Sequence, residues 1–180
     1  MSLREYITTQ FGLIPSFVYI MSLLIFVAGC FAFWRKNKSN MALHGIFTIL
    51  LIEYVFVILC STVIFRNTSD ISRYHLIPFW SYAAKPYGHV LLMPETIVNI
   101  VMFIPIGILA CIIIKGLGWK YAILLGACIS CVIEILQFFF RKGVSEFDDV
   151  FHNTLGCIIG YGIYRLSRWH FGRLNSRGNE

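Results

Sequence analysis

The chain has 180 residues, of which 58% are hydrophobic and only 13% are charged, and its mean hydropathy is +0.74. Because a soluble domain usually has about 25% charged residues, this composition excludes a water-soluble globular protein. The net charge of +6 is no indication of nucleic-acid binding, because cytoplasmic loops of membrane proteins carry an excess of Lys and Arg. We therefore expect one all-α polytopic membrane protein.

Five apolar runs follow one another along the chain, and each is a candidate transmembrane helix. The runs are residues 14–34, 44–65, 95–114, 119–140 and 149–166, and the last is shorter and weaker than the others. The predicted organisation is an N-terminal segment (1–13), two transmembrane helices (14–69), a core of an outer loop and three helices (70–166), and a basic cytoplasmic tail (167–180).

The distribution of basic residues predicts the orientation of these helices. With the N-terminus outside, the segments 35–43, 115–120 and 165–180 face the cytoplasm and hold nine of the 15 Lys and Arg residues. The outer segments hold the other six. The sequence therefore predicts an N-out, C-in bundle of about five helices.

Polar side chains interrupt the last three runs, where placing a polar group in hydrocarbon is costly. By helical spacing, Glu134, Gln137 and Arg141 share one face of the fourth helix. Asp149 and Asn153 share one face of the fifth. A bundle interior supplies partners that lipid does not, so we expect these faces to converge.

The third helix carries Asn99 at about the same depth as Glu134, a turn or two below the outer surface at a rise of about 1.5 Å per residue. The adjacent carboxylates of Asp148 and Asp149 repel each other, so a cation, a metal or a substrate is expected to hold them. Interhelical hydrogen bonding without any ligand remains the alternative, above all for the amides.

Other polar and sulfur-containing residues have less specific interpretations. Glu53 stands alone in the second run, which favours a role in helix packing, and His152 is either an interface residue or part of the polar cluster. The six cysteines fall in apolar runs and are expected to be small buried side chains without disulfides. Cys128 and Cys131 form a CxxC in mid-helix, without the further ligands of a metal site.

Three segments together resemble the VanZ-like family of bacterial membrane proteins. Residues 99–107 (NIVMFIPIG) resemble its N-x-x-x-F-x-P-x-G motif, residues 134–141 (EILQFFFR) resemble E-x-x-Q with a following basic residue, and residues 148–160 (DDVFHNTLGCIIG) resemble D-D-x-x-x-N-x-x-G-x-x-x-G. In the outer loop, residues 76–79 (LIPF) resemble the end of N-L-I-P-F, with His75 where the family usually has Asn. The resemblance covers about residues 70–166.

The resemblance implies a multi-pass protein of the bacterial cytoplasmic membrane that acts in the cell envelope and is associated with lowered susceptibility to teicoplanin. It gives no reaction and no cofactor. It also implies that the motif residues form one site. We name Glu134 and Asp149 as candidate catalytic residues, and as candidate substrate-binding residues Asn99, Gln137, Arg141, Asp148 and Asn153.

Two functions follow from this site. In the first, the outer-leaflet cluster binds or modifies a membrane lipid, a lipid-linked cell-wall precursor or a lipoglycopeptide antibiotic, with Arg141 facing a phosphate or carboxylate. The aromatic residues of the outer loop, namely Phe79, Trp80, Tyr82 and Tyr87, would cover an acyl chain or sugar. In the second, the protein is a hydrolase or transferase on a polyprenyl-phosphate or phospholipid head group. Glu134 is then the general base, and Asp148 and Asp149 hold a divalent cation.

Overall fold

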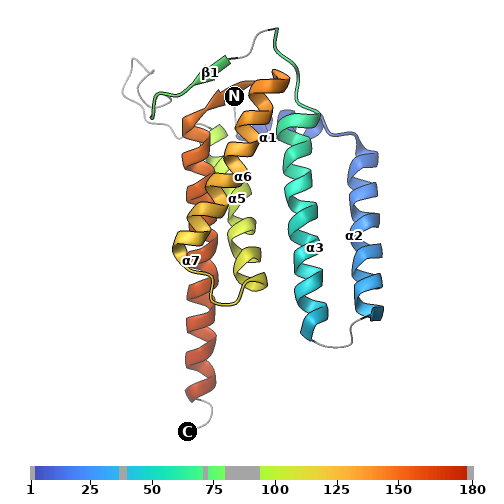
Figure 1. Ribbon diagram of the computed structural model, residues 1–180, viewed down its shortest axis with the longest axis vertical. Coiled ribbons are helices and arrows are strands. Elements are labelled where there is room, and N and C mark those ends of the chain that lie inside the picture. The colour runs from blue at the N-terminus through green and yellow to red at the C-terminus, as the bar shows by residue number, and fades with distance from the viewer. Residues whose placement is uncertain (1–2, 37–39, 71–72, 80–93, 178–180) are drawn as a thin grey trace.

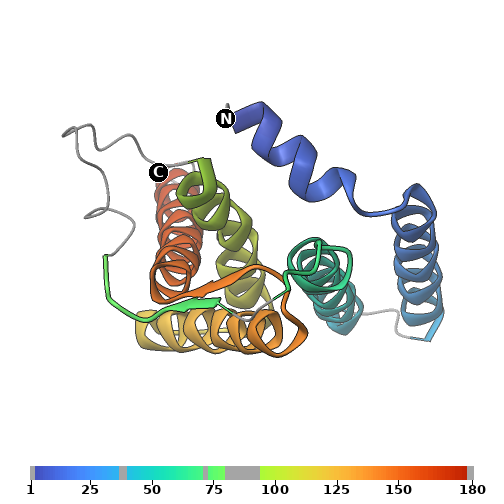
Figure 2. The same cartoon turned by 90° about the horizontal axis from the view of Figure 1, so that it is seen from above.

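The computed structural model describes residues 3–36, 40–70, 73–79 and 94–177. Most of these segments form long helices that stand side by side (Figure 1), and the short helix at the N-terminus lies across them (Figure 2). The α-helices are α1 (Leu3–Gly12), α2 (Ser16–Lys36), α3 (Asn40–Leu59), α5 (Pro94–Ile113), α6 (Trp119–Phe140) and α7 (Phe147–Arg177). A π-helical turn, η1 (Cys60–Ile64), continues α3.

The chain is an all-helical membrane protein. Among the described residues, three segments are long and apolar enough to cross a bilayer, namely Leu43–Ile64, Pro94–Ile113 and Trp119–Phe140, and Ser16–Ala32 is a shorter apolar helix. These segments correspond to four of the five predicted runs. The fifth run lies in α7, which extends beyond its neighbours through the predicted basic tail (Figure 1). The number of crossings and the orientation stay predictions.

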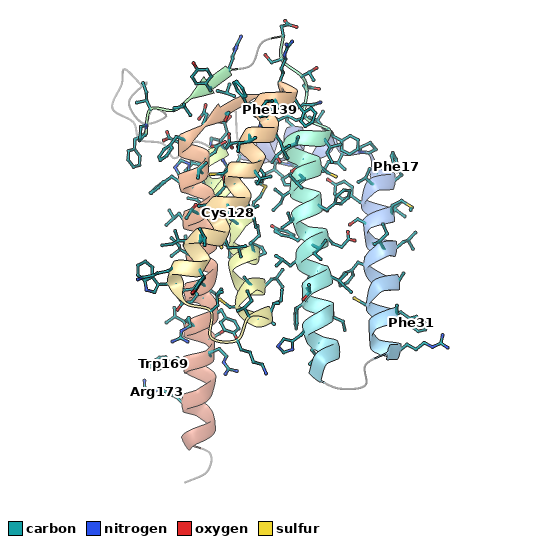
Figure 3. All side chains as sticks on the ribbon, viewed as in Figure 1. Phe17, Phe31, Cys128, Phe139, Trp169 and Arg173 are labelled. Carbon is teal, nitrogen blue, oxygen red and sulfur yellow. The ribbon has the colours of Figure 1, made fainter. Side chains whose placement is uncertain are left out.

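The helices form two groups (Figure 2). One contains α5, α6 and α7, of which α5 and α7 share the most extensive contact, and α2 stands beside α3 in the other. A core cluster that includes Ile58 of α3, Phe103 of α5, Ile133 of α6 and Cys157 of α7 joins the groups. On the opposite side of α2, Phe17 and Phe31 point away from the bundle, as expected for a lipid-facing helix (Figure 3).

Glycines allow α5 and α7 to approach each other closely. A Cβ atom at Gly156 would collide with the carbonyl oxygen of Ile100, and one at Gly160 would collide with that of Ile104. This close approach is typical of the GxxxG spacing of Gly156 and Gly160, and it places the polar faces of the two helices in contact.

Two short strands at the end of the bundle lie outside any sequence prediction. Strand β1 (Arg73–His75) pairs in parallel with β2 (Val144–Glu146), which connects α6 to α7. Each strand has only three residues, too few for the alternation that reveals a strand in a sequence. The pairing fixes the segment after α3 against the connection between α6 and α7.

The expectation for Glu53 and part of that for the cysteines hold. The hydroxyl of Ser22 donates to Glu53 Oε2 at 2.7 Å, so Glu53 joins α3 to α2 as a helix-packing residue. All six cysteines are in the described segments and are free. The expectation of burial is wrong for Cys128 and Cys131, which are exposed on the outer face of α6, where Figure 3 labels Cys128.

Candidate functional site

Polar side chains line a cavity of about 140 Å³ at the end of the bundle where α6 ends and α7 begins. Its walls come from α1, from η1 and the residues that follow it, and from α5, α6, β2 and α7. Five of the candidate residues line it together, namely Asn99, Glu134, Gln137, Asp149 and Asn153. The structure thus brings the polar faces of three helices together.

The pair Asn99 and Asp149 connects α5 to α7 across this cavity. The amide Nδ2 of Asn99 donates to Asp149 Oδ1 at 2.8 Å, and Asn99 is only 8% exposed. The pair forms because each residue lies a turn or so from the start of its helix, on the face where α5 and α7 touch. One carboxylate oxygen of Asp149 thus accepts a hydrogen bond from protein.

Glu134 is buried in the wall between the cavity and strand β2, with 6% of its surface exposed. Its Oε2 accepts a hydrogen bond from the backbone N–H of Glu146 at 2.9 Å, and the Ser145 side chain also hydrogen-bonds to it. The carboxylate therefore fixes the connection between α6 and α7 while it faces the cavity.

The amides of Gln137 and Asn153 use their N–H groups within the protein. Gln137 Nε2 donates to the carbonyl oxygen of Thr62 at 3.1 Å, and Asn153 Nδ2 donates to Ser130 Oγ at 2.7 Å. Within the described residues, Gln137 Oε1 and Asn153 Oδ1 are buried and accept no hydrogen bond. Both residues line the cavity, so it contains acceptors without donors.

Two predicted site residues, Asp148 and Arg141, do not line the cavity and bind other segments instead. Asp148 Oδ1 accepts the backbone N–H of Phe79 at 2.6 Å, so this carboxylate holds the LIPF segment against the start of α7. Arg141 is exposed and donates through Nη1 to the carbonyl oxygen of Asp70 at 3.3 Å. Arg141 has a left-handed backbone, with φ of 56°, and ends α6. The spacing from Glu134 to Arg141 therefore does not continue one helical face.

The cation that does line the cavity is Arg66, which the sequence reasoning did not select. It lies two residues after the end of η1, and its guanidinium packs against Gly143, where an added Cβ would lie 2.8 Å from Arg66 Cζ. The Nζ of Lys142 donates to the carbonyl oxygen of Arg66 at 2.8 Å. A signal was available, because Arg66 is the first charged residue after the second apolar run.

Further carboxylates and a buried histidine complete the surroundings. Glu95, in the first turn of α5, and Glu146, in β2, also line the cavity. His152 is 2% exposed, and its ring packs edge-on to Phe151 at a centroid distance of 5.7 Å. The loop residues Trp80, Tyr82 and Tyr87 lie outside the described residues.

The two carboxylates predicted to hold a divalent cation, Asp148 and Asp149, hydrogen-bond to different elements. In the described parts of the chain, no three His, Cys, Asp or Glu side chains are grouped as ligands for a metal ion. Asp148 and Asp149 also have different partners, Phe79 for the first and Asn99 for the second. Asp148 and Asp149 are thus adjacent in sequence, but each carboxylate is bound to a different part of the protein.

An apolar groove of about 450 Å³ lies on the other side of Glu134, on the outer face of α6. Aromatic and aliphatic side chains line it, among them Tyr74, Ile135, Phe138 and Phe139. Phe139 is 74% exposed and projects from this end of the bundle (Figure 3). Glu134 and Glu146 line both the groove and the polar cavity, so the two spaces adjoin.

Comparisons with known proteins agree with these observations. A family model described as VanZ/LLP1 matches residues 45–168. Protein VanZ of Enterococcus faecium is 37% identical over 81 residues, which cover 44% of this chain and 49% of that protein. The matched part thus spans about half the length of this curated relative. No solved structure matches the chain.

Proposed function

Because this chain belongs to the VanZ/LLP1 family, we propose that it binds a membrane lipid or a lipid-linked cell-envelope precursor at the outer leaflet of the bacterial cytoplasmic membrane. The polar head group enters the cavity, and the hydrocarbon chain lies in the groove along α6. Binding of this lipid is the function for which the residues around Glu134 are arranged.

One observation carries this proposal, namely that a polar cavity and an apolar groove adjoin at Glu134 and Glu146. An amphiphile has the same division into a polar and an apolar part. A soluble ligand would gain nothing from an apolar groove on a lipid-facing helix, whereas a hydrocarbon chain of the bilayer can pack against its side chains by van der Waals contact. The side chains that line the groove, such as Ile135 and Phe138, are suited to such a chain.

The family resemblance supports a place in the cell envelope. We propose that occupation of this site lowers the susceptibility of the cell to teicoplanin or a related lipoglycopeptide. Such an antibiotic is itself a polar molecule with an acyl chain, so it is either a direct ligand of the site or a competitor for the same lipid.

Filling the groove tests the proposal. Ile135→Trp places a large ring in the groove, and Leu124→Trp adds the same ring on the same helix outside it, at a residue of similar exposure (58% against 54%). Native mass spectrometry of the purified variants should show less bound lipid for Ile135→Trp and unchanged lipid for Leu124→Trp. Glu134→Gln should weaken binding from the cavity side.

The cellular measurement is the minimum inhibitory concentration of teicoplanin in a susceptible Gram-positive host. Expression of the natural chain and of Leu124→Trp should raise it, whereas Ile135→Trp and Glu134→Gln should not. Equal lipid occupancy and equal inhibitory concentrations in all variants would refute the proposal.

A second candidate function is acid–base chemistry on the same head group. The observation that favours it is that two carboxylates, the buried Glu134 and the half-buried Asp149, line the same cavity, as a general acid and base would. In that case, Glu134→Gln retains lipid binding but stops formation of a hydrolysed or transferred product. Incubation of the purified protein with radiolabelled phospholipid and polyprenyl phosphate, followed by chromatography, would reveal such a product.

A further inference from the structure

The amides of the cavity direct their donors to protein and leave their acceptors for a ligand. Gln137 is the clearest case, because a backbone carbonyl such as that of Thr62 can only accept. The nitrogen of Gln137 must therefore face Thr62, which fixes Oε1 as the unused atom. Gln137 is 2% exposed, and no described residue donates to its Oε1. A buried acceptor of this kind requires a donor.

The charged side chains of the cavity also favour a ligand that donates hydrogen bonds. Its described lining contains four carboxylates, those of Glu95, Glu134, Glu146 and Asp149, and a single cation, Arg66. Glu134 is buried, Glu146 and Asp149 are half-buried and Glu95 is exposed, and carboxylates in this lining outnumber guanidinium groups four to one, so the cavity is acidic. The cavity therefore favours a positively charged ligand group with several N–H donors, and it disfavours a phosphate at the same position.

Size and geometry narrow the choice of this cation. A cavity of about 140 Å³ accepts a group of roughly the size of benzene. A sugar–peptide head group needs a pocket of at least about 300 Å³. Since the described side chains also lack a metal-ligand grouping, the matching cation is an organic one.

We propose that the cavity binds a primary ammonium group on the head of the lipid. This inference rests on the proposed function, because it names the head-group chemistry for the same site. The three N–H donors of the ammonium meet Glu134, Asp149 and the unused oxygen of Gln137. Arg66 is left for the acidic part of a zwitterionic head group.

The experiment measures binding of three lipids to the purified protein in detergent by native mass spectrometry. Dioleoyl phosphatidylethanolamine has a free ammonium group, its N-acetyl derivative has the same phosphate and chains without the charge, and dioleoyl phosphatidylglycerol has no amine. Soluble phosphoethanolamine, added as a competitor, distinguishes a lipid head group from a free amine. The variant Asp149→Asn removes one carboxylate of the cavity, and Asp70→Asn removes an exposed carboxylate outside it.

Phosphatidylethanolamine should bind at least about tenfold more tightly than the other two lipids, as expected for a hydrogen bond between charged groups. Asp149→Asn should abolish this preference and Asp70→Asn should retain it. Competition by phosphoethanolamine at equal concentration would assign the site to soluble amines and overturn the lipid part of the inference.

The comparison of lipids on the natural chain does not depend on whether a variant folds. Equal binding of all three lipids, reduced by Ile135→Trp, would overturn the ammonium inference while the proposed lipid-binding function stands. If neither these three lipids nor polyprenyl phosphate binds saturably, the proposed function is overturned, and the ammonium inference with it.

Discussion

Replacement of Gly156 by Ala tests whether the contact between α5 and α7 holds the site together. The added Cβ has no space, because the carbonyl oxygen of Ile100 and the Cβ of Phe103 already occupy its position. Backbone cannot rotate aside as a side chain can, so the two helices must separate. Overpacking of this kind costs about 1–3 kcal/mol.

Gly162 provides a matched control on the same helix, because a Cβ there meets nothing within 4 Å. Both substitutions gain the same helix propensity, about 1 kcal/mol, so their difference isolates the packing cost. For a chain of this size, about 1–3 kcal/mol corresponds to roughly 2–12 °C in melting temperature.

Thermal unfolding of both variants in detergent, followed by circular dichroism, is the assay. Gly156→Ala should melt below Gly162→Ala by that interval and should bind less lipid, because the separation weakens the bond between Asn99 and Asp149. Equal melting temperatures would show that α5 and α7 are not in close contact at this glycine.

Three further predictions concern the polar contacts and the topology. Asn99→Ala leaves Asp149 without its amide donor and should lower the free energy of unfolding by about 1–3 kcal/mol. Asn67→Ala, at an exposed position, should change this free energy little. Equal effects of the two substitutions would contradict the pairing of Asn99 with Asp149. Ser22→Ala removes the donor to Glu53 and should cost about 0.6–1.7 kcal/mol in a thermal melt, the range for hydrogen bonds between membrane helices. A green fluorescent protein fused to the C-terminus should fluoresce and an alkaline phosphatase fused there should be inactive, and the reverse would contradict the N-out, C-in topology.

The sequence allowed the helices and most of the cavity to be predicted, for physical reasons. A run of about 20 apolar residues has few structures open to it other than a membrane helix, so the apolar runs correspond to helices. Within a helix, spacing fixes the face, which is why Asp149 and Asn153 line one cavity. The cost of polar groups in lipid then predicts that such faces meet, as they do with Asn99 of α5.

The predictions were wrong where the chain leaves helical geometry. Arg141 was predicted to share a face with Glu134. Arg141 itself has a left-handed backbone and ends α6, and its side chain donates to the carbonyl oxygen of Asp70. Arg66 was not selected because it precedes the region of resemblance that began at residue 70. It lies just after η1 and packs against Gly143, which precedes β2, and neither η1 nor β2 has a pattern in the sequence.

The contact between Glu134 and β2 explains why the site lies at this end of the bundle. Irregular backbone near a membrane must have its N–H groups satisfied by protein, and the carboxylate of Glu134 satisfies that of Glu146. Glu134 therefore supports the connection between α6 and α7 and also faces the cavity. Glu134→Ala would remove both roles together, whereas Glu134→Gln retains an acceptor oxygen for Glu146 and removes only the charge. A loss of lipid binding in Glu134→Gln with an unchanged melting temperature would thus assign the carboxylate charge to the ligand rather than to the fold.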